Sequence, residues 1–190
     1  MKTDYDVIVV GAGHAGSEAA AAAANMGSET LLVTMDMTRI AQMSCNPSMG
    51  GIAKGQIIRE LDALGGYSGI VTDRSMIQYR MLNLSKGPAM WSPRAQCDRN
   101  YFSLVWRQQL ESINQLYLWQ DKVTSLIFDQ NVVTGVKTQL GVSFYGKAVI
   151  LTNGTFLNGL MHIGDVQIAG GRAREASSSG ISERLAKVGF

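Results

Sequence analysis

The chain has 190 residues, of which 46% are hydrophobic and 17% are charged, and its formal net charge is +2. This length allows one domain with a sizeable core, and the composition is ordinary for a globular protein. A net charge this small does not require a nucleic-acid partner, although a local basic patch would be sufficient for one. No apolar run reaches the ~18 residues of a membrane-spanning helix, so we expect no membrane attachment.

The N-terminus enters an apolar strand pattern almost at once, which leaves no room for a secretory signal. Cys45 and Cys97 are far apart and form no metal or redox spacing. We therefore interpret them as cytosolic thiols, predict a cytoplasmic protein and predict no metal site.

The organising stretch is residues 6–16, in which an apolar run meets three glycines and then an alanine-rich segment. This pattern predicts a strand, a tight turn and a helix over 14–26. Gly11 would allow the turn, Gly13 would let a pyrophosphate approach the backbone, and Gly16 would let helix and strand pack closely. The helix N-terminus would then favour the phosphates. A glycine-rich turn without a ligand is the alternative, but the flanking strand and helix patterns favour dinucleotide binding.

A second strand over 30–34 completes the βαβ unit. In the usual pattern an acidic residue ends this strand and binds the adenosine ribose, but here the position holds Thr34. Either Asp36 reaches back to the ribose, or hydroxyl and backbone groups hold it. We slightly favour Asp36.

The segment 37–55 is rich in small, polar and glycine residues, which indicates a long loop shaped against a ligand rather than a disordered one. Within it, Cys45 is either an inert small hydrophobe or a reactive thiol favoured by the glycines and helix start nearby. A helix should follow over 56–64. Residues 69–84 mix both periodicities, so we expect an irregular segment with a short strand there.

A helix is expected over about 98–113, with Phe102, Val105, Trp106 and Leu110 on one face. The pattern then changes to β, with strands over 116–119, 123–129, 132–138 and 142–145 forming an antiparallel excursion. Residues 147–152 form an apolar strand of the kind buried on both faces of a parallel sheet. A last helix opens over 182–188.

This order resembles the FAD-binding fold of the two-dinucleotide-binding-domain flavoproteins, a Rossmann-like α/β fold. The antiparallel excursion, at about 116–145, is what favours FAD over a simple NAD dehydrogenase. We expect the chain to hold only the N-terminal part of that domain, so that the domain is incomplete.

Several motifs in order resemble the GidA family, also called MnmG. They are Gly-Ala-Gly-His-Ala-Gly-Ser-Glu-Ala-Ala at 11–20, Gln-Met-Ser-Cys-Asn-Pro-Ser-Met-Gly-Gly-Ile-Ala-Lys-Gly at 42–55, Glu-Leu-Asp-Ala-Leu-Gly-Gly at 60–66, Ser-Lys-Gly-Pro-Ala at 85–89, Arg-Ala-Gln-Cys-Asp-Arg at 94–99, Leu-Thr-Asn-Gly-Thr-Phe-Leu at 151–157, His-Ile-Gly at 162–164 and Gly-Gly-Arg-Ala at 170–173. The 42–55 loop is the most specific of these. Residues 91–93 and 175–179 depart from the family pattern.

The resemblance implies the large subunit of an enzyme that places (carboxymethyl)aminomethyl groups on C5 of the wobble uridine of tRNA. It implies FAD, reduced by NADH, and methylene-tetrahydrofolate as the one-carbon donor. The implied partners are tRNA, a second copy of the chain and the GTP-hydrolysing subunit MnmE, two copies of each. It also implies an NADH-binding domain and a C-terminal helical domain, neither of which is in this chain.

Site residues follow from the same resemblance. The segment Gly11, Ala12, Gly13, His14, Ala15 and Gly16 would line the FAD pyrophosphate, and Val123 would contact the adenine through backbone groups. Cys45 would be the catalytic candidate. The other cofactor-binding candidates are Asp36, Asn46, Gly50, Gly51, Lys54, Thr152, Gly154, Arg172 and Ser178.

Basic residues could pair with phosphates of FAD or tRNA, although each alone is most often a solvated charge. Lys54 and Arg172 lie in glycine-rich loops and rank first; the others are Arg59, Lys86, Arg94, Arg99 and Arg174. Two alternative functions remain open at this point. One is another FAD-dependent oxidoreductase that acts on a small molecule, and the other is a non-catalytic fragment.

Overall fold

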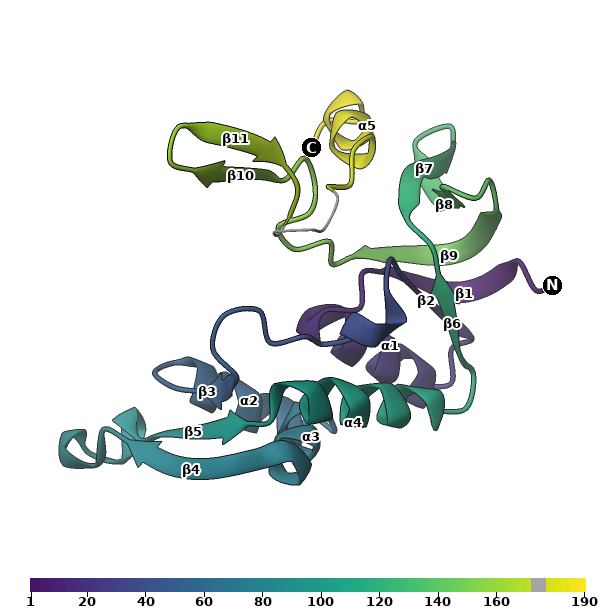
Figure 1. The fold of residues 1–190 in the computed structure, drawn as a ribbon. Coiled ribbons are helices and arrows are strands. Elements are labelled where there is room, and N and C mark those ends of the chain that lie inside the picture. Colours follow the sequence, from purple (N-terminus) through teal and green to yellow (C-terminus); the bar gives the residue numbers. More distant parts are fainter. Residues whose placement is uncertain (172–176) are drawn as a thin grey trace.

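The computed structural model describes residues 1–171 and 177–190. Its centre is a six-stranded sheet in the order β6-β2-β1-β9-β8-β7, and a separate three-stranded antiparallel sheet, β3-β5-β4, forms an arm beside α2 and α3 (Figure 1). A two-stranded hairpin, β10-β11, lies near the C-terminus. No helix among the described residues is long and apolar enough to cross a membrane.

The elements have the following bounds. The helices are α1 His14–Asn25, α2 Lys54–Ala63, α3 Ser68–Ser75, α4 Arg99–Glu111 and α5 Ile181–Lys187, with short 3-10 turns η1 Met37–Arg39, η2 Leu84–Lys86 and η3 Pro88–Met90. The strands are β1 Asp4–Val10, β2 Thr30–Thr34, β3 Ser48–Gly50, β4 Met76–Leu82, β5 Ser92–Cys97, β6 Leu116–Gln120, β7 Val123–Asp129, β8 Val132–Thr138, β9 Ser143–Leu151, β10 Leu160–Ile163 and β11 Val166–Ala169.

The predicted βαβ unit is confirmed, because β1 pairs in parallel with β2 and α1 connects them. Alternate residues of these strands enter two separate cores. Val9 and Leu32 pack with α1 and α4, while Ile8 and Leu31 pack with β7, β8, β9 and α5. The parallel strands are therefore covered on both faces, as an α/β sheet requires.

The helix predicted over 98–113 is confirmed as α4. Asp98 caps its N-terminus by accepting from the backbone N–H groups of Asn100 and Tyr101, at 2.9 and 2.8 Å. Phe102, Trp106 and Leu110 are fully buried on its apolar face. The hairpin at 123–138 is also confirmed, with β7 antiparallel to β8.

The strand predicted at the start of the antiparallel excursion belongs instead to the parallel part of the sheet. β6 pairs in parallel with β2, in the register Thr30 to Leu116 and Val33 to Trp119. The helix α4 before it provides the crossover that a parallel connection needs. The excursion therefore begins at β7 and not at residue 116.

Residues 142–145 and 147–152, predicted as two strands, form the single strand β9. The prediction that residues 147–152 are buried on both faces holds only in part, because Val149 and Leu151 pack against one core and Ile150 against the other, yet all three stay partly exposed. Only Phe144 is buried within β9, and Lys147 is exposed and pairs with Asp6 at 2.7 Å. A run of apolar letters reports side-chain type, whereas burial depends on what other segments cover the strand.

The segment 69–84, predicted to be irregular, is a helix followed directly by a strand, α3 and β4. The start of α3 is fixed by a residue that is distant in sequence. The Glu18 carboxylate of α1 accepts from the backbone N–H groups of Tyr67 and Ser68, with shortest distances of 3.0 and 2.6 Å. β4 then pairs with β5, a strand that the sequence pattern did not predict. The sequence pattern also missed β3 and the β10-β11 hairpin.

Phe102 is one of the fully buried residues of α4 in the core that also contains α1. It is 0% exposed and its ring lies edge-on to His14, with centroids 5.7 Å apart. We expect Phe102→Ala to lower the free energy of unfolding by about 3–5 kcal/mol, because it removes a large buried side chain and leaves a cavity. Urea denaturation followed by circular dichroism measures this. Leu104→Ala on the same helix is the control, since Leu104 is 48% exposed and should change stability by less than about 0.5 kcal/mol; equal losses in both variants would contradict the assigned core.

Candidate dinucleotide-binding site

The candidate site lies at the edge of the sheet where its parallel strands end together. β1, β2, β6 and β9 are mutually parallel and end at Val10, Thr34, Gln120 and Leu151. In open α/β sheets ligands bind outside the carboxyl ends of the strands. The residues that follow each strand therefore form one candidate surface, and Gly11 to Gly16 lie at its centre.

The three glycines of the turn have different surroundings. Gly11 has φ +100°, and a Cβ there would lie 2.7 Å from the Thr152 carbonyl oxygen. A Cβ on Gly16 would lie 1.8 Å from the Gly11 carbonyl oxygen and 2.5 Å from Thr152 Oγ1. A Cβ on Gly13 would meet nothing within 4 Å. Gly11 and Gly16 are thus required by the fold itself, and only Gly13 faces open space.

Thr152 joins the end of β9 to this turn. Its backbone N–H donates to the Val10 carbonyl at 2.9 Å, and its hydroxyl lies within donating distance of the carbonyls of Val10 and Gly11, at 2.9 and 2.8 Å. The predicted neighbours Gly11, Gly16 and Thr152 are therefore brought together. The next residue, Asn153, has a buried side-chain oxygen with no hydrogen-bond partner in the part of the chain that the structure describes.

The N-terminus of α1 fits an anionic group. Gly13 is its N-cap, no side chain caps this end, and the first turn holds no acidic residue. The backbone N–H groups of a first helical turn have no partner within the helix, and the helix dipole favours negative charge there. With the open space at Gly13, this end can accept a pyrophosphate without a clash, so the residues present fit a dinucleotide such as FAD.

Val123 and Ser178, both predicted to bind the cofactor, contact each other beyond the end of β6. The Ser178 hydroxyl donates to the Val123 carbonyl at 3.2 Å, and both residues are buried. They are 55 positions apart in sequence, so the structure and not the local pattern places them together. The backbone N–H of Asp121 donates to the Thr34 carbonyl at 2.9 Å, which ties this corner to the end of β2.

Asp36 lies near the same corner, but its carboxylate already has protein partners. One oxygen accepts from the backbone N–H and the hydroxyl of Thr38, at 2.8 and 2.6 Å, and the other pairs with Arg39 at 3.1 Å. The Thr38 hydroxyl, with the backbone N–H of Thr38 and the Arg39 guanidinium, holds the pKa of Asp36 below its ordinary value. Asp36 thus shapes the turn after β2 as the N-cap of η1.

The 37–55 loop, which was predicted to lie against the ligand, contacts the glycine turn with its first part and the β3-β5-β4 arm with its second part. It begins against the glycine turn, where the Ala41 N–H donates to the Ala12 carbonyl at 2.8 Å. It then leaves for the arm, where β3 pairs with β5 and the Gly51 N–H donates to the Pro93 carbonyl at 2.9 Å. A Cβ on Gly50 would lie 2.1 Å from that same carbonyl, so Gly50 is explained by its packing against β5.

The remaining predicted residues lie on exposed segments. They are Cys45 and Asn46 before β3, Lys54 at the start of α2 and Gly154 after β9. The Cys45 carbonyl accepts from Arg99 Nη2 at 2.8 Å, which fixes the backbone while the side chain stays exposed. Arg172 and Arg174 lie outside the described residues.

Within residues 1–171 and 177–190, no three His, Cys, Asp or Glu side chains gather as metal ligands would. Sequence reasoning missed two polar residues that the structure identifies as candidates. Asn153 has a buried side-chain oxygen without a partner among the described residues, and Arg80 lines a pocket on the arm. For Asn153, the available signal was its position directly after a strand that ends beside the glycine turn. For Arg80, the available signal was that polar Gln78 and Arg80 alternate with Tyr79 and Met81, as in a strand, although residues 69–84 had been predicted to be irregular.

Substitution of the two glycines should separate folding from cofactor binding in the full-length gene product. Gly16→Ala should lower stability by about 1–3 kcal/mol, because its methyl group overlaps the Gly11 backbone. Gly13→Ala should change stability by less than about 1 kcal/mol yet lower the bound flavin, because its methyl group fills the space that a pyrophosphate needs. Flavin released on denaturation and urea midpoints measure the two effects. Full flavin content in a folded Gly13→Ala protein would contradict the site.

The two cysteines should differ in reactivity in the folded 190-residue chain. Cys45 is exposed, whereas Cys97 is 1% exposed and burial raises the pKa of its thiol. We expect a maleimide to add rapidly once, at Cys45, and a second time only after unfolding, as followed by intact-mass spectrometry. Cys45→Ser should abolish the rapid addition. Rapid addition at both thiols in native buffer would show that the packing around Cys97 is wrong.

A family model described as glucose inhibited division protein A matches residues 6–190. Among curated relatives, the tRNA uridine 5-carboxymethylaminomethyl modification enzyme MnmG of Phocaeicola vulgatus is 64% identical over 190 residues, and the enzyme of the same name from Flavobacterium johnsoniae is 65% identical over 187. These matches cover 100% and 98% of this chain, and the chain spans about 30% of the length of each relative.

Solved structures agree with the fold. Aquifex aeolicus GidA superposes with a TM-score of 0.94 at 47% identity, covering 99% of this chain and 31% of that one. A GidA-related protein from Thermus thermophilus gives 0.66 at 25% identity, covering 98% and 69%. PqsL of Pseudomonas aeruginosa, described as a probable FAD-dependent monooxygenase, gives 0.56 at 14% identity over 77% of this chain and 41% of its own, which shows the shared fold alone. By the match over residues 6–190, the chain belongs to the GidA family.

Proposed function

We propose that this chain is the FAD-binding part of an enzyme that adds a (carboxymethyl)aminomethyl group to C5 of the wobble uridine of tRNA. The observation that carries the proposal is the glycine turn, in which Gly11 and Gly16 are held by the fold while Gly13 faces open space at an uncapped helix N-terminus. The names of relatives at 64% and 65% identity supply the reaction. They do not favour the alternative of a small-molecule oxidoreductase.

The proposed cofactor contacts follow the order of the site. Residues 11–16 hold the pyrophosphate, and the Val123 backbone with Ser178 meets the adenine end. Thr152 and Gly154 lie beside the flavin ring, with Thr152 holding the turn through its hydroxyl. Asp36 is proposed at the ribose, where its carboxylate oxygens keep lone pairs in addition to those used by Thr38 and Arg39.

The other proposed contacts come from the 42–55 loop and the tail. Asn46, Gly50, Gly51 and Lys54 would border the cofactor, Arg172 would pair with a phosphate, and Cys45 is the catalytic candidate. Exposure of Cys45 and the fixed position of its backbone support its access to a substrate. FAD, when bound, would supply the redox chemistry; the residues of this chain bind it, orient it and shape the space for the base.

The family resemblance extends the proposal to the complete enzyme. We propose NADH as reductant, methylene-tetrahydrofolate as one-carbon donor and tRNA as substrate, in a cytoplasmic complex of two copies with two of the GTPase subunit MnmE. Residues 1–190 would then be the N-terminal part of the FAD-binding domain. The NADH-binding and C-terminal helical domains would lie in the rest of a longer protein, and this chain alone would be inactive.

Deletion of the gene tests this function. We expect mass spectrometry of tRNA nucleosides to show that C5-modified wobble uridines are lost. The full-length gene should restore them, and a gene for residues 1–190 should not, because the proposed NADH and partner domains are then missing.

Two results would contradict the proposal. Normal wobble nucleosides in the deletion strain would indicate a different flavoenzyme. Equal flavin content in the purified 190-residue chain and the full-length gene product, measured by fluorescence after denaturation, would show that the FAD-binding domain is not incomplete.

A further inference from the structure

The antiparallel arm has two chemically different faces. One face packs into the core through Met49, Ala95 and Cys97. Because directly opposed residues of antiparallel strands share a face, the register places the outward side chains in rows across β3, β5 and β4. One row is Ser48, Gln96 and Gln78, and the next is Gly50, Arg94 and Arg80.

Arg80 and Arg94 are directly opposed across β4 and β5, and both are exposed. In residues 1–171 and 177–190 neither guanidinium forms an ion pair, and Arg94 makes one long hydrogen bond, at 3.4 Å to Ser48 Oγ. Like charges directly opposed on a sheet are destabilising. This arrangement therefore opposes stability, and a structural role does not explain it.

The sequence of the arm contains no charge that would offset the pair. Residues 76–97 hold Arg80, Lys86 and Arg94 and no Asp or Glu. An ordinary solvated face carries both signs interspersed. A group of cations without acids on one arm, here on β4, η2 and β5, instead indicates attraction of a polyanion.

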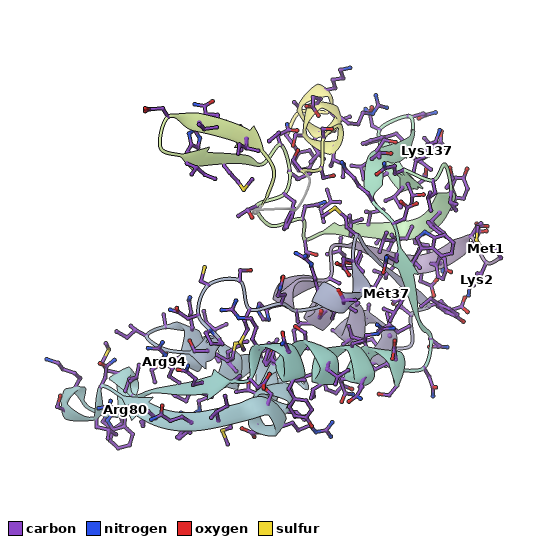
Figure 2. The ribbon with its side chains drawn as sticks, viewed as in Figure 1. Met1, Lys2, Met37, Arg80, Arg94 and Lys137 are labelled. Carbon is purple, nitrogen blue, oxygen red and sulfur yellow. The ribbon has the colours of Figure 1, made fainter. Side chains whose placement is uncertain are left out.

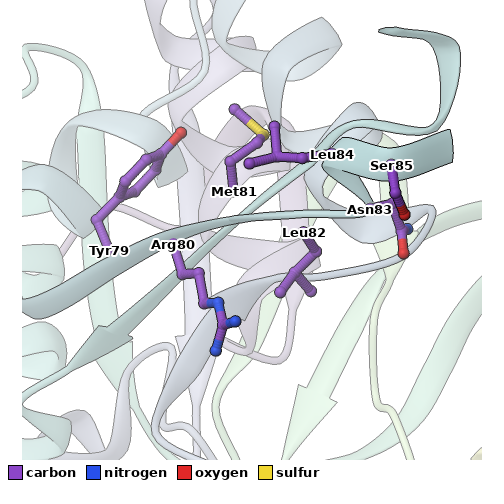
Figure 3. A pocket seen from close by; sticks show the side chains of 7 residues that line it. All are labelled: Tyr79, Arg80, Met81, Leu82, Asn83, Leu84 and Ser85. Atoms are coloured by element: carbon purple, nitrogen blue, oxygen red, sulfur yellow. The ribbon is translucent and has the colours of Figure 1, made fainter. Parts of the chain in front are cut away.

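The two arginines border a concave surface. A pocket of about 210 Å³ is lined by Gln78, Arg80, Leu82, Arg94 and Gln96. A second hollow of about 650 Å³ is lined by residues 79–85, and it shares Arg80 and Leu82 with the first. Figure 3 shows Arg80 and Leu82 on one side of the strand, and Tyr79 and Met81 on the other. Figure 2 places Arg80 and Arg94 together on the arm.

We propose that this outward face of β3-β5-β4 binds the sugar–phosphate backbone of the RNA substrate, with Arg80 and Arg94 on phosphate oxygens. The inference rests on the proposed function. Guanidinium forks match phosphate geometry, and the amides of Gln78 and Gln96 can both donate to and accept from ribose hydroxyls. Cations spread along the arm as far as Lys86 suit a ligand with repeated charges better than a ligand with a single carboxylate, and the paired guanidinium forks suit phosphates in particular.

The test compares the full-length gene product with its R80Q/R94Q variant. Binding of an unmodified tRNA is measured by fluorescence anisotropy at several salt concentrations. Each lost charged contact should weaken binding at low salt by about tenfold. Loss of two phosphate contacts should also flatten the slope of log affinity against log salt by about 1.5. The matched control is K137Q, which removes an exposed cation on β8, away from the arm (Figure 2).

A purely structural role predicts a lower melting temperature for R80Q/R94Q, whereas relief of the opposed charges predicts an unchanged or higher one. The inference is overturned if R80Q/R94Q binds tRNA with the same affinity and the same salt slope as K137Q. In that case the arginine pair does not bind RNA, and an acidic protein surface would be the alternative ligand of this face. It is also overturned if binding falls only together with flavin content and melting temperature. If the unsubstituted protein binds no tRNA, the proposed function itself fails, and the two failures are thereby distinguished.

Discussion

The contact between Gly16, Gly11 and Thr152 is the constraint on which the rest of the structure depends. Helix α1 approaches β1 so closely that a Cβ on Gly16 would overlap the Gly11 carbonyl. The residue after β9 adds to this contact, because the Thr152 hydroxyl lies within hydrogen-bonding distance of the Gly11 carbonyl and beside Gly16. One compact junction therefore sets the position of a helix and two strands. The open space at Gly13 is a consequence, because the turn is held at both sides and leaves its middle residue facing outward.

Features that depend on neighbouring residues could be predicted from the sequence. The apolar runs at 6–10 and 30–34, together with the glycines between them, were sufficient to predict the βαβ unit. The apolar spacing of Phe102, Trp106 and Leu110 was sufficient for α4. The turn at Gly11 and the close approach of Gly16 to the Gly11 carbonyl are also local, whereas the contact of both glycines with Thr152 joins distant residues.

Features that depend on distant partners could not be predicted. The start of α3 requires Glu18, 49 positions before Tyr67. Ser178 meets Val123 across 55 positions. β6 looks like any short β segment, and only its place beside β2 makes it a parallel strand. The arginine pair of the arm could not be predicted for the same reason. In the sequence Arg94 looks like an ordinary solvated cation, and only the pairing of β4 with β5 places Arg80 opposite it.

The arm and the glycine turn are separate surfaces, but α1 connects them. Its N-terminus forms the candidate anion site, and one turn later Glu18 accepts from the backbone at the start of α3, which leads directly into β4. Phe102 on α4 packs against the same helix, because its ring contacts His14 edge-on. α4 itself follows β5, the strand that carries Arg94. The candidate anion site and the arginine pair are therefore joined through α1, α3 and α4, and these packed helices would hold the two surfaces in fixed relation.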